Sequence, residues 1–408
     1  MPLLKRYLSK EASIKELEKV KVVLGNGFDL FCGVKSSYKD FFESQNEWFT
    51  FYKQDCAKKA NVFGDSYSFL CDSDNYVSFN GKNGLNVWMA FFALASEKDN
   101  NYRWCDIETM MSCSFSFSWK GLSWSRVLNF LNDEDDDLIE GDFQNIYLAS
   151  VFKHIYHIDS VIDKDSFYNL LLEQLNIFEN TFISYIKRCH ANLIYSSYGV
   201  VSKNVTFTKN CKYVLNFLCN IDNVVSIDTF NFDETDDELI DYKIKHINGD
   251  FEYPIFGVDS NYFQADDPRF IFTKLSRRMN YEMNNQNGFS DEEFENVVIF
   301  GHSLSEHDYS YFFPLFDRLN ILQFELRNRI VFAFAVYDID DKPQIIKSFR
   351  KAVLDLFANY AKYKSLKITP ERLLDSLTTQ NRIIMYQLPI PGVKHDSKDN
   401  EFGTRKLY

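Results

Sequence analysis

The stretch Val20–Leu30, V-K-V-V-L-G-N-G-F-D-L, decides the fold of this chain. A short apolar run ends at two glycines that bracket an asparagine, and an aspartate follows two residues later. The run predicts a buried strand, and Gly25 and Gly27 predict a tight turn that lets backbone amides approach a ligand closely. Strand, glycine turn and helix form the geometry in which a sheet presents N–H groups to a nucleotide phosphate.

Two observations extend this first prediction. Ser36 and Ser37 stand where a helix over 38–52 needs an N-cap. The G-x-G spacing lacks the third glycine of the usual dinucleotide-binding fingerprint. A tight turn that binds no ligand is therefore the alternative interpretation of the same residues.

Composition bounds the class of protein. At 408 residues the chain is too long for one compact core, so we expect two lobes or one domain with a large insertion. Apolar residues make up 45%, and 40 Phe and 24 Tyr predict cores built from aromatic rings. The net charge is −13, whereas a general nucleic-acid binder carries an excess of Lys and Arg.

The sequence predicts a cytoplasmic protein without a membrane segment. The first ten residues, M-P-L-L-K-R-Y-L-S-K, lack the apolar centre of a signal peptide, and no stretch of about eighteen apolar residues is present. The eight cysteines are scattered without a C-x-x-C pair, which is typical of reduced thiols and predicts neither a disulfide framework nor a zinc site.

The order of the predicted elements indicates an α/β fold with a Rossmann-like, mostly parallel sheet and a large helical insertion. We expect 1–35 to hold an N-terminal helix, the first strand and the glycine loop, 36–215 a largely helical insertion, 216–391 the rest of the α/β domain and 392–408 a charged tail. The strands are predicted at Val20–Leu24, Val224–Phe230, Lys243–Ile247, Tyr253–Val258, Val297–Phe300, Arg329–Tyr337 and Ile383–Leu388. The main helices are predicted at 38–52, 85–97, 165–193, 343–360 and 369–380.

Polar residues follow four of the predicted strands. They are G-N-G-F-D at 25–29, T-F-N-F-D at 229–233, H-I-N-G-D at 246–250 with F-G-V-D at 256–259 behind it, and G-H-S-L at 301–304. In open α/β sheets, ligands bind outside the carboxyl ends of the strands. The predicted fold therefore brings these groups to one edge.

The chain resembles the AbiH family of bacterial phage abortive-infection proteins. The resemblance rests on G-N-G-F-D-L at 25–30, S-S-Y-K-D-F-F at 36–42, W-C-D-I-E at 104–108, T-F-N-F at 229–232, H-I-N-G at 246–249, F-G-V-D at 256–259 and G-H-S-L-S-E-H-D at 301–308. These matches run in order from about residue 20 to 320. The resemblance implies an antiphage role in which an infected cell arrests or dies before the phage matures.

The same series of motifs is more distantly similar to sirtuin-like NAD-binding domains, in which an asparagine and a histidine flank the nicotinamide ribose. The resemblance implies that Asn231 and His246 are catalytic here. It also implies a nucleotide site formed by Gly25, Asn26, Gly27, Asp29, Asp259, Gly301, His302, Ser303 and Asp308. In it Gly25, Asn26 and Gly27 hold the pyrophosphate, and Gly301 and Ser303 the adenosine half. Apart from the resemblance, Asp29 or Asp259 is expected to bind ribose hydroxyls, as an acidic group does in dinucleotide sites.

The chain departs from these families in two ways. It lacks the zinc-binding cysteine pairs of sirtuin deacylases, which argues against protein deacylation. Phe232 and Asp233 stand where AbiH relatives often have Tyr-Thr, so the detailed role of that loop does not follow from the resemblance. His302 and His307 are five residues apart, a spacing that does not put two histidines on one helix face, and we predict no metal site.

The predicted reaction is hydrolysis of the N-glycosidic bond of NAD or a related nucleotide, with NAD as substrate and no cofactor. Positive charge develops on the ribose as nicotinamide leaves, and Asn231 positions the ribose or the attacking water. His246 serves as general base, because imidazole changes its protonation near neutral pH, or it orients a hydroxyl. In the alternative interpretation neither residue is catalytic: His246 is a half-buried strand histidine bonded to the backbone, and Asn231 is an ordinary turn asparagine.

Two rival functions use the same residues differently. In the first, the pocket binds a nucleotide signal without cleaving it, and the helical lobe acts on a partner. In the second, Asp106, Glu108 and Asp259 bind Mg²⁺ for nuclease chemistry. The expected partners are an NAD-like small molecule, a second copy of the chain and a phage-derived trigger. Neither a membrane nor nucleic acid in general is expected to bind.

Overall fold

The structure is a computed structural model that describes residues 14–44, 88, 107–108, 111–112, 164–195, 214–232 without 217, 243–284, 292–335 without 324, and 342–388. The chain divides into two compact units. The first consists of Met1–Ser36, Lys187–Glu252 and Gln286–Tyr408, and the second of Ser37–Ile186 and Tyr253–Asn285. Residues 187–215, predicted to lie in the insertion, fall in the first unit, and residues 253–285 fall in the second.

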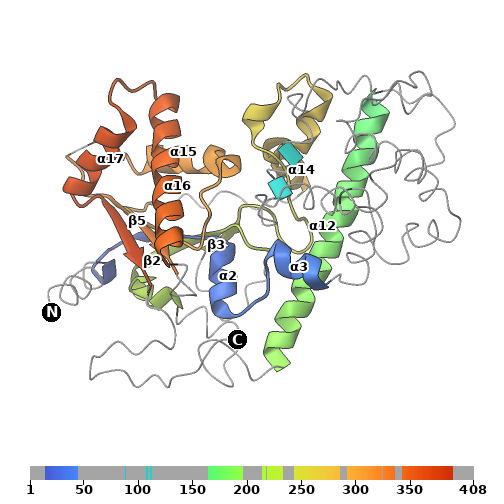
Figure 1. The fold of residues 1–408 in the computed structure, drawn as a ribbon, viewed down its shortest axis with the longest axis horizontal. Coiled ribbons are helices and arrows are strands. Elements are labelled where there is room, and N and C mark those ends of the chain that lie inside the picture. Colours follow the sequence, from blue (N-terminus) through green and yellow to red (C-terminus); the bar gives the residue numbers. More distant parts are fainter. Residues whose placement is uncertain are drawn as a thin grey trace, which may run out of the picture. The chain divides into compact units, whose positions relative to one another are not determined.

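The first unit holds a parallel sheet, of which β2, β3 and β5 are labelled in Figure 1. Its strand order is β3-β2-β1-β4-β5-β6. Every pair of neighbours among these described strands is parallel. The strands are β1 (Val20–Leu24), β2 (Val224–Thr229), β3 (Lys243–His246), β4 (Asn296–Phe300), β5 (Arg329–Phe334) and β6 (Ile383–Gln387). The α/β class and six of the seven predicted strands are confirmed.

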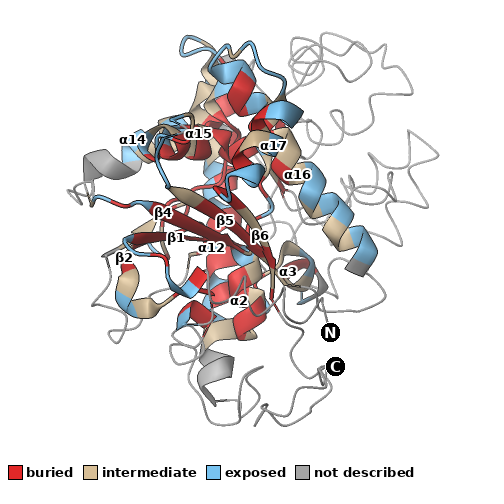
Figure 2. Cartoon of the chain, turned by 90° about the vertical axis from the view of Figure 1, so that its left-hand side faces the viewer, coloured by how far each residue is buried: buried red, intermediate tan, exposed pale blue. Residues whose placement is uncertain are grey.

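Helices cover both faces of this sheet (Figure 2). On one face Val20, Val22 and Leu24 pack with residues of α2 (Asn26–Cys32) and with Val214, Leu215 and Leu218. On the other, Val23, Val297 and Ile299 pack against α15 (Tyr309–Arg318), α16 (Lys342–Tyr363) and α17 (Pro370–Thr379). The central strands β1 and β4 are buried along their whole length, as continuous apolar runs predict for a parallel sheet.

One buried ion pair interrupts the apolar centre of the sheet. Lys21 of β1 is 4% exposed, and its Nζ donates to Oδ1 of the buried Asp228 on β2 over 2.7 Å. The hydroxyl of Tyr311 on α15 donates to the other oxygen of Asp228 over 2.7 Å. The two buried charges therefore compensate each other, and their hydrogen bonds link β1, β2 and α15.

Several helices differ from their predicted bounds. The glycine turn leads straight into α2 at Asn26, and the helix predicted at 38–52 is α3 (Tyr38–Ser44), with residues 45–52 outside the described part. As predicted, Ser37 caps α3, because its Oγ accepts from the N–H of Asp40 over 3.0 Å. The predictions at 165–193, 343–360 and 369–380 correspond to α12 (Lys164–Tyr195), α16 and α17.

Besides α2, two further described α-helices were not predicted from the sequence. α15 contains Pro314, which lacks an N–H and normally ends a helix. α14 (Lys274–Asn284) is mostly polar, with only three apolar residues besides its tyrosine, Leu275, Met279 and Met283, to signal a buried face. The helix predicted at 85–97 is described only at Trp88, and the charged tail at 392–408 lies outside the described residues. No described helix is both long and apolar enough to cross a membrane.

The second unit has an aromatic core, as the composition predicts. Phe41 of α3 contacts Phe178 and Phe182 of α12, with ring centroids 6.0 and 5.2 Å apart. Phe256 packs against the same two rings at 5.6 Å. The indole N–H of Trp88 donates to the carbonyl of Leu171 over 2.9 Å. Burial of such rings is a large apolar contribution to stability.

The predicted strand at Tyr253–Val258 is wrong. Pro254 lies within it and has no N–H to donate. The N–H of Phe256 donates to the carboxylate of Glu179 on α12 over 2.9 Å. Only Val258 makes a strand-like bridge, to Thr273. The backbone of this segment therefore bonds to a side chain and one short bridge rather than to a neighbouring strand.

Glu179 is a buried acid in this core, 2% exposed, and Nη2 of Arg277 donates to it over 2.7 Å. Burial raises the pKa of Glu179 to about 7, with Arg277 acting in the opposite direction. The folded chain then retains a proton that the unfolded chain releases above its ordinary value of 4.5. Stability from this group is therefore lost as the pH rises from about 4.5 to about 7.

We predict that Glu179→Gln removes this pH dependence. Between pH 5 and pH 7 the unfolding free energy of the unsubstituted protein should fall by more than that of the variant. Urea unfolding followed by tryptophan fluorescence measures it, because the described tryptophan, Trp88, lies in this unit. Parallel pH curves for the two proteins would contradict the raised pKa.

We also predict that Asp228→Ala lowers the unfolding free energy of the first unit by about 3–5 kcal/mol, because it leaves the Lys21 charge buried without its partner. The control is Asp355→Ala, in the exposed pair of Lys351 and Asp355 on α16, which should cost less than about 1 kcal/mol. Circular dichroism during unfolding and hydrogen exchange of the β1 and β2 amides measure the loss of unfolding free energy in each variant. Equal losses in the two variants would show that the buried pair adds nothing.

Candidate functional site

The loops after β1 and β4 touch at distances that only glycine permits. The N–H of Gly25 donates to Phe300 O over 2.9 Å, and that of Gly27 donates to Gly301 O over 2.8 Å. A Cβ on Gly27 would lie 2.7 Å from the Cα of Gly301, and a Cβ on Gly301 would lie 2.4 Å from the nitrogen of Phe28. Gly301 also has φ +71°, in the left-handed region. These glycines join two strand ends side by side.

This packing bears on the expected pyrophosphate role of Gly25, Asn26 and Gly27. The N–H groups of both glycines already donate to backbone carbonyls. The exposed Asn26 accepts a hydrogen bond from the Ser36 hydroxyl through Oδ1. A phosphate at this loop therefore needs other donors, such as the side-chain N–H groups of Asn26. The role itself stays a prediction.

Asn231, at the end of β2, connects its loop to the glycine loop. Its side chain is 4% exposed, and Nδ2 donates to Asp29 Oδ1 over 2.8 Å and to Gly25 O over 3.2 Å. Its N–H donates to the hydroxyl oxygen of Thr229 over 3.1 Å. Three hydrogen bonds thus fix the orientation of Asn231 before any ligand binds.

His246 closes the same network from β3. Its Nδ1 lies 3.0 Å from the backbone oxygen of Asn231. A carbonyl oxygen only accepts, so Nδ1 carries the proton and, in the neutral ring, Nε2 is an unprotonated acceptor. Among the described residues none donates to Nε2, and the half-buried side chain lies at the carboxyl end of its strand. The hydrogen bond to the backbone that the non-catalytic interpretation of His246 predicts is thus present. The same bond leaves Nε2 able to accept a proton.

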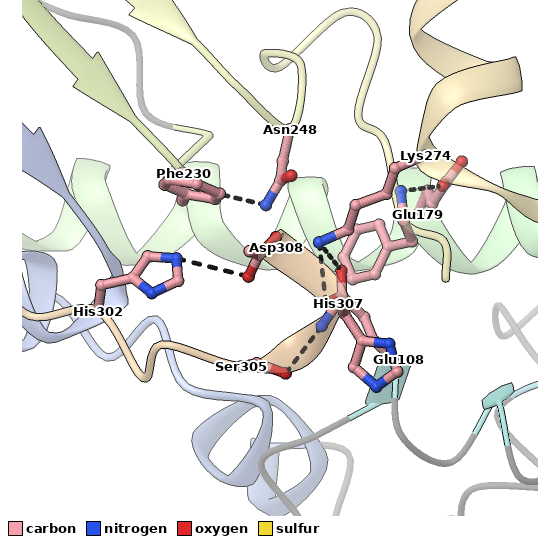
Figure 3. Close-up of polar contacts among 10 residues, drawn as sticks. Glu108, Glu179, Phe230, Asn248, Lys274, His302, Ser305, His307 and Asp308 are labelled. Atoms are coloured by element: carbon pink, nitrogen blue, oxygen red, sulfur yellow. Dashed lines mark hydrogen bonds and ion pairs between the residues drawn. The ribbon is translucent and has the colours of Figure 1, made fainter. Parts of the chain in front are cut away.

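Asn248 was not among the predicted site residues, although the H-I-N-G stretch contains it. Its Nδ2 donates to the backbone oxygen of Phe230 over 3.4 Å, and no described residue donates to its buried Oδ1 (Figure 3). Asn248 follows the end of a predicted strand, as Asn231 does, so the same sequence signal could have identified it as a site residue. Asn248 therefore adds an acceptor at the same edge of the sheet.

His302 and Asp308 hold the loop that follows β4. The N–H of Leu304 donates to Nδ1 of His302 over 2.8 Å, so the proton of the neutral ring is on Nε2. Nε2 lies 3.4 Å from Oδ2 of Asp308 (Figure 3). Both side chains are buried, and the His302 ring packs against Phe230 with centroids 4.3 Å apart. Their contacts join the loop after β4 to the loop after β2.

Ser303, in contrast, is exposed, although its neighbours His302 and Leu304 are buried.

The structure places ten of the eleven predicted site residues in the first unit, at the carboxyl ends of β1 to β4. These are Gly25, Asn26, Gly27, Asp29, Asn231, His246, Gly301, His302, Ser303 and Asp308.

The remaining predicted residue, Asp259, belongs to the second unit, where its buried carboxylate accepts from the N–H of Asn261 over 2.9 Å and caps a short 3-10 helix. Glu108 pairs there with the buried Lys274 at 2.8 Å (Figure 3). Asp106 lies outside the described residues. Within the described part of the chain, no group of three or more His, Cys, Asp or Glu side chains could hold a metal ion.

Comparison with known proteins identifies the family of this chain. A model of the family described as bacteriophage abortive infection AbiH matches residues 22–327, more than half of the chain. The chain belongs to the AbiH family. The match spans the loops after β1, β2, β3 and β4, which confirms the family resemblance and suggests a role in abortive infection. No curated protein and no solved structure shows significant similarity.

We predict that Gly301→Ala destabilises the first unit strongly, because the added Cβ meets backbone on the neighbouring loop at a strained φ. The adjacent Ser303→Ala, at an exposed position, is the control and should leave the melting temperature within about 2 °C. Thermal unfolding by circular dichroism measures both. A Gly301→Ala protein as stable as the control would contradict the close contact of the two loops.

Proposed function

We propose that this AbiH-family protein acts in abortive infection by binding NAD or a related nucleotide at the carboxyl edge of its sheet and hydrolysing the N-glycosidic bond. The observation that carries the proposal is the hydrogen bond from Nδ1 of His246 to the backbone of Asn231. It selects the tautomer in which Nε2 is free to accept a proton. A fixed tautomer is a usual requirement for a histidine general base.

The topology supports a nucleotide as the ligand. The strand order 3-2-1-4-5-6 is that of doubly wound sheets that bind dinucleotides in the crevice where the chain order reverses. Here that reversal lies between β1 and β4, beside Gly25 and Gly301. The sirtuin-like resemblance of the motifs belongs to this proposal as a second, weaker support.

The reaction consumes one water and releases nicotinamide, ADP-ribose and a proton. The bond between the ribose C1′ and the pyridinium nitrogen breaks with its electron pair going to nitrogen, so nicotinamide leaves as a neutral molecule. Water forms the new bond to C1′, and Nε2 of His246 takes its proton. In this scheme the amide oxygen of Asn231 orients the water or the ribose, because Nδ2 already donates within the protein.

The other groups at the edge have binding roles in this proposal. The exposed side chains of Asn26 and Ser303 offer hydrogen-bond donors to phosphate and ribose, one on each side of the strand-order reversal. His302 and Asp308 support the Ser303 loop from inside. A phage-derived trigger and self-association are the proposed means of control.

One observation favours the non-catalytic alternative. The amides of Gly25, Gly27 and Asn231 are all engaged in holding the loops together. Such a rigid edge also suits a protein that senses a nucleotide and acts through a partner. The two functions differ in whether the bound nucleotide is cleaved.

The test is incubation of the purified full chain with NAD, with and without phage lysate, and quantification of nicotinamide and ADP-ribose. We predict turnover that His246→Ala lowers about 10²- to 10⁴-fold, the usual contribution of general base catalysis. The control is His190→Gln, a half-buried histidine on α12 whose ring contacts Phe251, and it should retain turnover.

Three results would decide between the functions. Nicotinamide release that depends on His246 supports hydrolysis. Binding of NAD by calorimetry without release supports the sensing alternative and overturns hydrolysis. Neither binding nor release under both conditions overturns the nucleotide site as a whole.

A further inference from the structure

Asp29 is a deeply buried carboxylate at this edge of the sheet. It lies in α2, two residues after Gly27, and is 2% exposed. Its Oδ1 accepts the shorter of the two hydrogen bonds that the Asn231 side chain donates, 2.8 Å against 3.2 Å to Gly25 O. A hydrogen bond to a carboxylate is stronger than one to a neutral carbonyl, so Asp29 is the main anchor of that side chain.

The anchored residue in turn holds the histidine. The backbone oxygen of Asn231 accepts from Nδ1 of His246 over 3.0 Å. The position of this oxygen depends on how the Asn231 residue is held, by its side chain and by its N–H on Thr229. Asp29, Asn231 and His246 therefore form a chain of two hydrogen bonds that crosses three strand ends, those of β1, β2 and β3.

We infer that Asp29 is a positioning residue that fixes the tautomer and orientation of His246 through Asn231. The inference rests on the proposed function for its catalytic meaning, since it assigns Asp29 to the hydrolysis that His246 assists. It differs from the role expected from the sequence, in which Asp29 binds ribose hydroxyls. A ribose ligand must reach the carboxylate, whereas Asp29 is only 2% exposed and its Oδ1 already accepts from Asn231.

Two substitutions separate these roles. Asp29→Asn removes the charge but keeps an oxygen that can accept from Nδ2 of Asn231, whereas Asp29→Ala removes the acceptor. For a positioning residue, Asp29→Ala lowers kcat about 10- to 100-fold with KM little changed, and Asp29→Asn restores most of kcat. For a ribose-binding residue, both substitutions raise KM. Asp222→Ala, at an exposed position in the same unit, is the control and should change neither parameter.

A spectroscopic measurement tests the inference without substrate. The full chain contains seven histidines, and ¹⁵N labelling of histidine with His246→Ala for assignment reports the tautomer of His246. We expect a proton on Nδ1 in the unsubstituted protein and in Asp29→Asn. In Asp29→Ala we expect a mixture in which the Nε2–H form appears, because the carbonyl of Asn231 is no longer held in place.

The two readouts distinguish the inference from the proposed function. If the unsubstituted protein releases no nicotinamide, hydrolysis fails, while the tautomer shift still tests the link between Asp29 and His246. If Asp29→Ala does not fold, Asp29→Ser, whose shorter side chain cannot reach Asn231, takes its place. A folded Asp29→Ala or Asp29→Ser protein with the Nδ1–H signature unchanged would overturn the inference.

Discussion

The carboxyl edge of this sheet depends on a close approach of backbone to backbone that only glycine allows. Gly25 and Gly27 after β1 press on Gly301 after β4, with two N–H to carbonyl bonds between the loops. A side chain at Gly27 or Gly301 would separate the two strand ends at the point where the chain order reverses. That reversal is where doubly wound sheets bind ligands, so the contact sets the geometry of every polar group around it.

Polar contacts then select one arrangement of the edge. The apolar faces of β1 and β4 would be satisfied by many loop conformations, because apolar packing is not directional. Asn231 is directional, and it reaches residues more than two hundred positions earlier in the chain. His246 and Asp29 are linked through it. Directional hydrogen bonds of this kind favour a single conformation, and a fixed histidine tautomer is one result.

The sequence predicts the strands better than the site. Short, mainly apolar runs such as Val20–Leu24 and Val297–Phe300 predict buried strands, and the structure agrees. Tyr253–Val258 has a similar composition, but a distant carboxylate, Glu179, takes the N–H of Phe256. The motif order predicts which residues reach the edge, because parallel strands end together. It cannot predict that the glycine amides and the Asn231 amide are already engaged, since those partners are defined only by the folded loops.

The family match ends at residue 327, before β5 and β6. Strand β4, N-V-V-I-F, is buried along its length and pairs with β1 on one side and β5 on the other. Without β5 it would be an outer strand with unpaired N–H and C=O groups and a continuous apolar surface, a template for pairing with other copies of the chain. The last two strands therefore protect the part of the sheet that carries the family's motifs from aggregation.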